Sequence, residues 1–295
     1  MILAGVTIAR PLVIGIANGA GYGLVAIGLV LIYKSSRVFN FAAGEFVTLG
    51  AYATYLAAFH VPYLLAMVAG VLAGLAAGLA TERLVVRPLS ARPKVTVLVA
   101  TAAIATAVIP MEIVIGHLRT FPARPVIKKP LNAFHIFGVF ISWQQLLIVL
   151  ILAGAGAGLA YFFSRTDLGL ATLASSQEPT ATRLMGIRLN RISSLMWGTA
   201  GALGGLAGVL LAPVTFGFAP AFGTTDVLIA AFTAAVLGGM TSVPGAFVGG
   251  VLVGVVQSLA QFNLGHIPGA NSVAVFVVLI AVLLVRPTGL LGTEA

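Results

Sequence analysis

The feature that most constrains this chain is a series of long apolar runs divided by short polar breaks. The first run starts after Arg10 and reaches Tyr33, and similar runs follow as far as Val285. An apolar run of about 20 residues crosses the hydrocarbon core of a bilayer as a helix. Lipid offers no partner to unpaired backbone groups, so such runs fold as helices with internal hydrogen bonds. The sequence therefore predicts an all-α, polytopic integral membrane protein.

Composition excludes a soluble alternative. Hydrophobic residues make up 60% of the chain and charged residues only 8%, whereas soluble domains carry about 25% charged residues. Seven acidic and sixteen basic residues cannot form the polar shell of a soluble protein of 295 residues. We expect a single transmembrane domain over residues 1–295, without a soluble domain, and with membrane lipid around most of its surface. The first run is interpreted as an uncleaved first span.

The polar breaks divide the chain into about nine transmembrane or re-entrant helices. They fall at residues 34–37, 60–62, 83–94, 116–135, 164–191, 213–225, 238–245 and 263–271. The fourth helix contains Pro110 and the segment after Pro220 is short, so either of them could be broken or re-entrant.

Basic residues in the short breaks predict the orientation, because Lys and Arg concentrate on the cytoplasmic side. They place the breaks at 34–37, 83–94 and 164–191 inside, the N-terminus outside and Arg286 inside. The net charge of +9 has the same explanation and does not indicate nucleic acid. The break at 116–135 is an exception, because it carries four basic residues on the predicted outer side: Arg119, Arg124, Lys128 and Lys129.

The sequence contains no motif of an enzyme. Cysteine is absent, which excludes disulfides and thiolate ligands, and no Gly-Lys dipeptide occurs to form a phosphate-binding loop. The four histidines lie in the breaks, at 60, 117, 135 and 266, and the two in the break at 116–135 are at its opposite ends. No partner at helical spacing completes a metal site around any of them. We therefore expect no cofactor and no bound metal.

Acidic residues inside apolar runs are functional candidates, because intramembrane charge is costly. Three occur: Glu45, Glu112 and Asp226. Glu112 is expected to reach the membrane interface, and Asp226 to cap a helix N-terminus. Asn40 could cap a helix that begins inside the membrane, which would place Asn40 and Glu45 beside a translocation path. A packing carboxylate hydrogen-bonded between helices is the alternative for Glu45.

The central break, at about 164–191, predicts a short amphipathic helix at the inner membrane surface. Pro179 suits its first position, and Gly186 can end it in the left-handed conformation. Ala181, Leu184 and Met185 form an apolar stripe that could dock on another protein or lie in the interface.

Glycine is frequent, with 35 residues, and small faces let membrane helices approach closely. Clusters beside Asn or Pro, at 18–21 and 244–245, suggest unwound helices instead. No internal repeat is evident in the sequence.

Several blocks along nearly the whole chain resemble the permease family of branched-chain amino-acid ABC importers. The central loop from Asp167 to Ile187 resembles the family's cytoplasmic signature. The other blocks are Phe39-Asn-Phe-Ala-Ala-Gly-Glu-Phe46, Glu82-Arg83 with Arg87-Pro-Leu89, Phe232-Thr-Ala-Ala-Val-Leu-Gly-Gly239 with Pro244-Gly-Ala246, and Arg286-Pro-Thr-Gly-Leu-Leu-Gly292.

The resemblance implies the membrane subunit of a binding-protein-dependent importer in a bacterial or archaeal plasma membrane. Its partners would be cytosolic ABC ATPases, a second and different permease chain, and an extracytoplasmic substrate-binding protein. The segment containing Glu178, Pro179, Ala181, Leu184 and Gly186 would couple it to an ATPase.

The chain departs from the family at two positions. Position 43 is Ala where His is common, and Glu178 replaces Asp or Asn. The competing interpretation is an ion-coupled secondary transporter that uses Glu45 and Asp226. The sequence alone does not choose among branched-chain amino acids, other amino acids, amides and urea as cargo.

Overall fold

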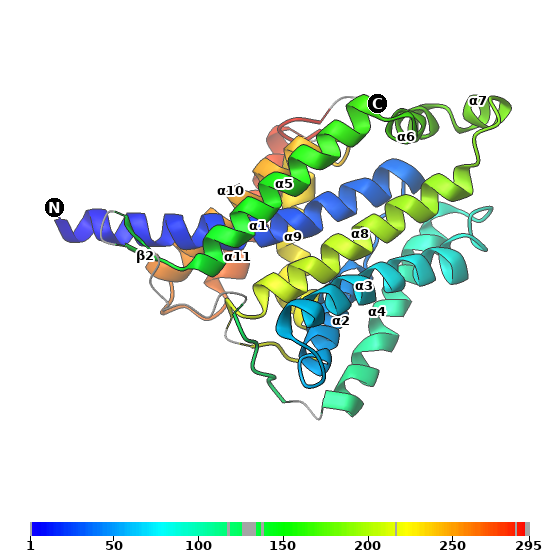
Figure 1. The fold of residues 1–295 in the computed structure, drawn as a ribbon. Helices are drawn as coiled ribbons and strands as arrows, with labels where there is room; N and C mark the ends of the chain where they lie inside the picture. Colours follow the sequence, from blue (N-terminus) through cyan, green and yellow to red (C-terminus); the bar gives the residue numbers. More distant parts are fainter. Residues whose placement is uncertain are drawn as a thin grey trace.

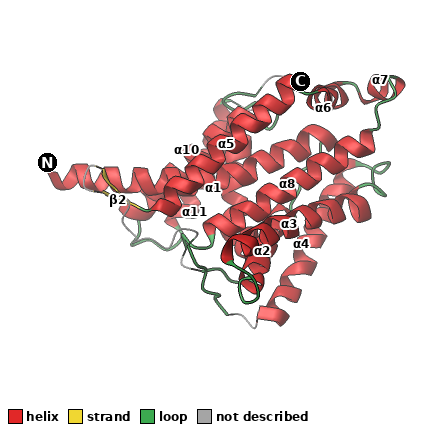
Figure 2. Cartoon of the chain, in the orientation of Figure 1, coloured by secondary structure: helices red, strands yellow, loops and turns green. Residues whose placement is uncertain are grey.

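The structure is a computed structural model that describes residues 2–116, 119–125, 134–136, 139–215, 217–286 and 288–292. Helices dominate these ranges (Figures 1 and 2), which confirms the predicted fold class. The elements are α1 (Ile2–Ser36), α2 (Ala43–Ala57), α3 (Tyr63–Thr81), η1 (Glu82–Val86), α4 (Lys94–Gly116), β1 (Phe134–Ile136), β2 (Val139–Ile141), α5 (Trp143–Arg165), α6 (Asp167–Gln177), α7 (Pro179–Leu184), α8 (Leu189–Leu211), η2 (Gly223–Leu228), α9 (Ile229–Gly238), α10 (Val243–Asn263) and α11 (Ala270–Val285).

Six helices in the described ranges are long and apolar enough to cross a membrane. They belong to α1, α3 with η1, α4, α5, α8 and α10. Three shorter elements join them: α2, η2 with α9, and α11. These nine elements of the described chain agree with the predicted number. The fourth helix passes Pro110 unbroken, whereas the segment after Pro220 is short, from Gly223 to Gly238.

The helices pack in two reciprocal sets. α1 lies along α10 and α3 along α8, while α2 packs on α3 and α9 packs on α10. These contacts repeat when α1, α2, α3 and α4 are matched in chain order with α8, α9, α10 and α11. The first four helices therefore correspond to the last four. Five membrane helices, α1 to α5, precede α8, so the second set has the opposite orientation to the first. Inverted repeats of this kind are common in transporters, and here they are visible only in the structure.

Two central helices form most of the core. The membrane-crossing windows of α1 and α8 are 78% and 72% buried, compared with 22% for that of α4. Fully buried side chains such as Leu24, Ile27, Trp197 and Leu210 fill the centre. α4 lies at the edge of the molecule (Figure 1).

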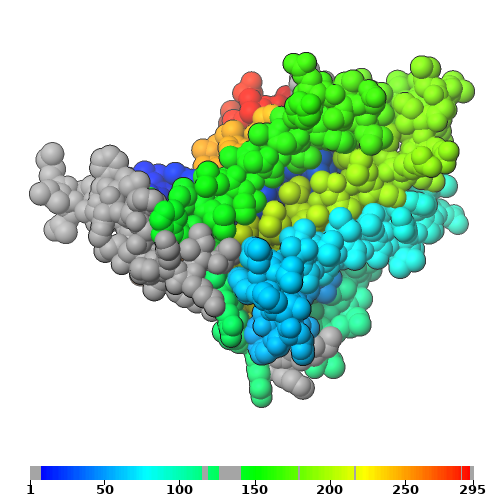
Figure 3. All heavy atoms as spheres, viewed as in Figure 1, coloured from blue at the N-terminus to red at the C-terminus, as the bar shows by residue number. Residues whose placement is uncertain are grey.

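The predicted inner segments gather at one end of the molecule. Arg37, at the end of α1, donates to the carbonyl of Ser176 in α6 at 3.1 Å. Figure 1 shows α6 and α7 at this end and the start of α1 at the opposite end, and Figure 3 shows α6 and α7 as a projection. The break at 34–37 and the break at 164–191 therefore lie at the same end, and the membrane side on which this end lies remains a prediction.

Three details differ from the sequence prediction. α6 is a separate helix that begins with a Thr166 cap, and β1 pairs with β2 as an antiparallel hairpin. α1 runs through residues 18–21 without unwinding, because Gly19 lies against Gly250 of α10 and the glycines serve close packing. Lys128 and Lys129 lie outside the described residues, as does the side chain of His135.

Candidate functional site

The first candidate site is the crossing of α2 and η2 in the centre of the membrane domain, where two short helices begin side by side. Gly44 and Gly223 touch there, because a Cβ on Gly223 would overlap the carbonyl oxygen of Gly44. Thr48 accepts a hydrogen bond from the Gly223 N–H at 3.0 Å. The hydroxyl of Thr48 thus satisfies a backbone donor at a helix start that lipid would leave unpaired.

Glu45 lies inside this crossing. Its side chain is 1% exposed, and Thr224 Oγ1 donates to its Oε1 at 2.5 Å. The contact matches the packing alternative, in which the carboxyl group is hydrogen-bonded between helices. Thr224 was not identified from the sequence, since it lies 179 residues away.

Asn40 does not cap α2 as predicted. The helix begins after Ala42, and no side chain caps it. Asn40 Oδ1 instead accepts from the Ala42 N–H at 3.0 Å, two residues on, in the turn that precedes the helix. Its Nδ2 is buried without a hydrogen-bond partner.

Glu112 does not reach the membrane interface as predicted, because it is turned inward. It is 4% exposed, and its Oε2 accepts from the Ala221 N–H at 2.8 Å. Ala221 has a φ of 63°, so the bond stabilises a backbone conformation that is rare outside glycine.

Asp226 also differs from its predicted role as a helix cap. It lies inside η2, whose N-cap is Phe222 and has no side-chain cap. Asp226 is exposed at the surface of the chain. Glu112 and Thr48 take the backbone donors near this helix start instead, which is why no acidic cap is needed.

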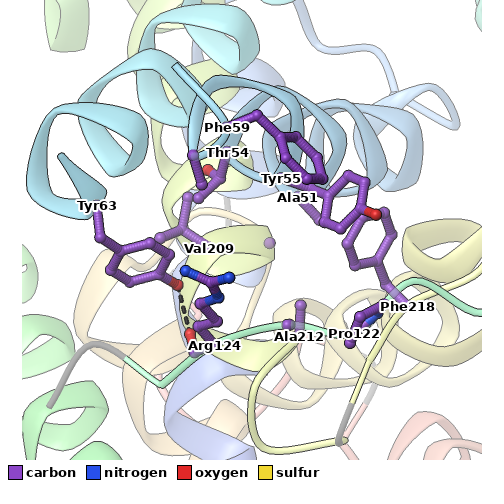
Figure 4. A pocket seen from close by; sticks show the side chains of 13 residues that line it. Ala51, Thr54, Tyr55, Phe59, Tyr63, Pro122, Arg124, Val209, Ala212 and Phe218 are labelled. Atoms are coloured by element: carbon purple, nitrogen blue, oxygen red, sulfur yellow. Dashed lines mark hydrogen bonds between the residues drawn. The ribbon is translucent and has the colours of Figure 1, made fainter. Parts of the chain in front are cut away.

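An aromatic cavity of about 210 Å³ lies towards the outer end (Figure 4). Its walls include Thr54, Tyr55, Phe59, Tyr63, Arg124 and Phe218. Tyr63 donates a hydrogen bond to the carbonyl oxygen of Arg124, which holds the 119–125 segment over the cavity. Sequence reasoning missed this cavity because its lining comes from three stretches that are distant along the chain, 51–63, 122–124 and 208–218.

The second candidate site is α7 at the inner end. Pro179 occupies its first turn, and Gly186 has a φ of 79°, as the sequence predicts. Leu184 and Met185 are 85% and 81% exposed, and Ala181 is exposed beside them. The chain thus presents apolar side chains that nothing in its described residues covers.

Glu178 precedes α7 without capping it. Its side chain accepts no cap hydrogen bond, whereas its carbonyl oxygen accepts from Thr182 Oγ1 at 2.8 Å. Thr182 is buried, so α7 packs on the rest of the chain through this side chain while Leu184 and Met185 stay exposed.

A polar network of Glu82, Arg87 and Ser194 connects η1 to the beginning of α8. Arg87 donates to both oxygens of Glu82, at 3.2 and 2.9 Å, and Ser194 Oγ donates to Glu82 Oε2 at 2.9 Å. Glu82 is 1% exposed. The network ties η1, below α3, to the first turns of α8, which follows α7 in the chain.

These features describe a multi-pass membrane protein with a short helix, α7, that exposes apolar side chains at one end. The family profile described as branched-chain amino acid transport system, permease component, covers residues 12–285, and the chain belongs to this family. It is a transport component rather than an enzyme. No group of three or more metal-ligating side chains occurs within the described part of the chain.

Curated relatives support the assignment over nearly the full length. The chain is 34% identical to the high-affinity branched-chain amino acid transport system permease protein BraD of Pseudomonas aeruginosa, over 96% of this chain and 95% of BraD. It is 31% identical to a probable branched-chain amino acid transport permease protein LivH of Methanocaldococcus jannaschii, over 92% and 88% of the two chains. LivH of Escherichia coli K12 is 29% identical, over 94% and 93%. No solved structure shows a significant match.

Proposed function

We propose that this chain is the membrane-spanning subunit of an ABC importer. It moves branched-chain or related amino acids across the membrane with energy from partner ATPases. The exposed apolar end of α7 is the observation that supports this proposal most directly. Apolar side chains exposed this fully on an inward segment indicate a partner surface. The chain has no phosphate-binding loop of its own, so a nucleotide-hydrolysing partner supplies the missing energy source.

In this proposal the loop at about 164–191 is the coupling segment of a single permease domain spanning residues 1–295. Leu184 and Ala181 sit in a groove of a cytosolic ATPase, and Gly186 sets the direction in which the chain leaves α7. Movement of α7 reaches the membrane helices through α8 and the Glu82 network. The other partners are a second, different permease chain and an extracytoplasmic binding protein.

The crossing of α2 and η2 is the proposed wall of the translocation path. Asn40 is itself buried and has an unpaired amide, whereas its neighbour Phe41 is 38% exposed, so Phe41 contributes the surface that cargo passes. Glu45 acts behind it and holds the crossing in place through Thr224. The separation of these two roles follows from their burial and contacts.

The coupling proposal is tested with Leu184→Asp, using Thr180→Asp as a matched control on the same helix. An unpaired carboxylate at a docked face costs several kcal/mol, so we expect Leu184→Asp to lose ATPase association and uptake. Thr180→Asp adds the same charge in the first turn, where it favours the helix dipole, and should retain both. Gly186→Pro should also uncouple transport, because proline cannot adopt positive φ.

Membrane insertion and thermal unfolding should be unchanged in all three variants, since α7 lies outside the membrane core. Wild-type ATPase association and uptake by Leu184→Asp would refute the role of α7.

A further inference from the structure

The pair of buried carboxyl groups at the crossing has an incomplete set of hydrogen bonds. Glu45 Oε1 accepts from Thr224, and Glu112 Oε2 accepts from the Ala221 N–H. The other two oxygens, Glu45 Oε2 and Glu112 Oε1, are buried without a partner. Unpaired buried acceptors are costly, and ionised ones much more so.

The two carboxyl groups are held close to each other, because Glu45 is bonded to Thr224 and Glu112 to Ala221, three residues apart at the start of η2. In the described part of the chain, the ion pair that forms is the one between Arg87 and Glu82, so neither Glu45 nor Glu112 has a basic partner. Two adjacent carboxylates cannot both remain ionised in a dry site, because like charges repel and neither supplies a donor.

We propose that Glu45 and Glu112 share one proton and form a proton-binding site in the centre of the membrane domain. The proton makes one carboxyl group a donor and leaves the other an acceptor, so a single O–H···O bond joins the two free oxygens. The pair then carries one negative charge, which the Thr224 hydroxyl and the Ala221 N–H stabilise from either side.

The shared proton fastens three elements together: α2 through Glu45, α4 through Glu112, and the start of η2 through Ala221 and Thr224. α4 is otherwise loosely packed at the edge of the molecule, with 22% of its membrane-crossing window buried. The proton site therefore positions α4 against the crossing.

Water is the competing donor. An apolar cavity of about 260 Å³ borders Glu112 and Tyr52, and the Tyr52 hydroxyl is also buried without a partner. Water in this cavity could solvate an ionised Glu112. The two arrangements differ in one measurable property, which is whether a protonated carboxyl group exists at neutral pH.

The test is infrared difference spectroscopy of the full-length chain in lipid at neutral pH, in H₂O and in D₂O. We expect a protonated-carboxyl C=O band that shifts in D₂O and is lost in both Glu45→Gln and Glu112→Gln. Asp226→Asn is the matched control and should keep the band, since Asp226 is exposed and outside the pair. If a Gln variant fails to fold, Glu45→Asp or Glu112→Asp replaces it; a shortened partner should shift or weaken the band, and an unchanged band would overturn the sharing.

Thermal unfolding gives a second readout. Each Gln variant keeps an amide donor towards the remaining carboxylate and should unfold near the wild-type temperature, whereas Glu112→Ala should unfold at a lower one. A wild-type spectrum without the band, or a band that persists in either Gln variant, would overturn the proposal.

Discussion

At the scale of single residues, buried polar side chains hold elements that are far apart in the sequence. Glu82 is the clearest case, because its buried carboxylate binds Arg87 on the same loop and Ser194 on α8. Thr48 and Glu112 do the same for the start of η2 and the turn before it. In each case a backbone or side-chain donor that would be unpaired in lipid receives its partner.

We predict that Arg87→Leu destabilises the protein, because it leaves Glu82 buried with Ser194 as its remaining donor. The expected loss is about 1–3 kcal/mol, with the half-exposed position of Arg87 limiting the effect. Arg92→Leu removes an exposed arginine of the same loop and should have little effect. Thermal unfolding in detergent compares the two, and equal unfolding temperatures would contradict the role of the network.

At the scale of elements, helix contact depends on glycine faces. α3 and α8 approach until Gly74 touches the carbonyl oxygen of Gly201, so a Cβ at position 74 would overlap this backbone atom. Glycine at such an interface permits van der Waals contact between backbones, which drives helix association in lipid.

We predict that Gly74→Ala separates α3 from α8 and costs about 1–3 kcal/mol through overpacking. Gly154→Ala in α5 is the matched control, because its Cβ would meet nothing within 4 Å. The control should be neutral or gain up to about 1 kcal/mol from helix propensity. Unfolding measurements in which Gly154→Ala is the more damaging change would refute this packing argument.

At the scale of the whole molecule, α7 exposes apolar side chains at one end, while the two inverted helix sets meet at the crossing. Glu45 is buried in this crossing and Asp226 is exposed. The structure therefore gives no shared site to the two carboxylates that an ion-coupled mechanism would use. This arrangement favours an importer subunit that depends on partners.

We predict that the chain alone, reconstituted in liposomes with a proton or sodium gradient, shows no uptake of leucine above background. Uptake should require the partner subunits and ATP, since the energy source lies outside this chain. Protein-free liposomes set the background. Gradient-driven uptake by the isolated chain would instead establish a secondary transporter.

The sequence by itself determined the fold class, the number of membrane elements and the bounds of α7. These properties depend on local composition: apolar run length, basic residues in short breaks, and the Pro179 and Gly186 signals at the ends of one short helix. For the same reason, the sequence identified Glu45 as an unusual intramembrane carboxyl group. The family blocks pointed to the permease family to which the chain belongs.

Only the tertiary structure decided which residues meet. It placed Glu112 inward rather than at the interface, and it paired Glu45 with Thr224. Asn40 bonds within a turn instead of capping a helix, and Asp226 lies exposed inside η2 instead of capping it. It also revealed the inverted sets, which have no evident sequence repeat. The physical reason is that a buried donor in lipid is satisfied by whichever acceptor the packing brings near, and this acceptor can lie more than a hundred residues away.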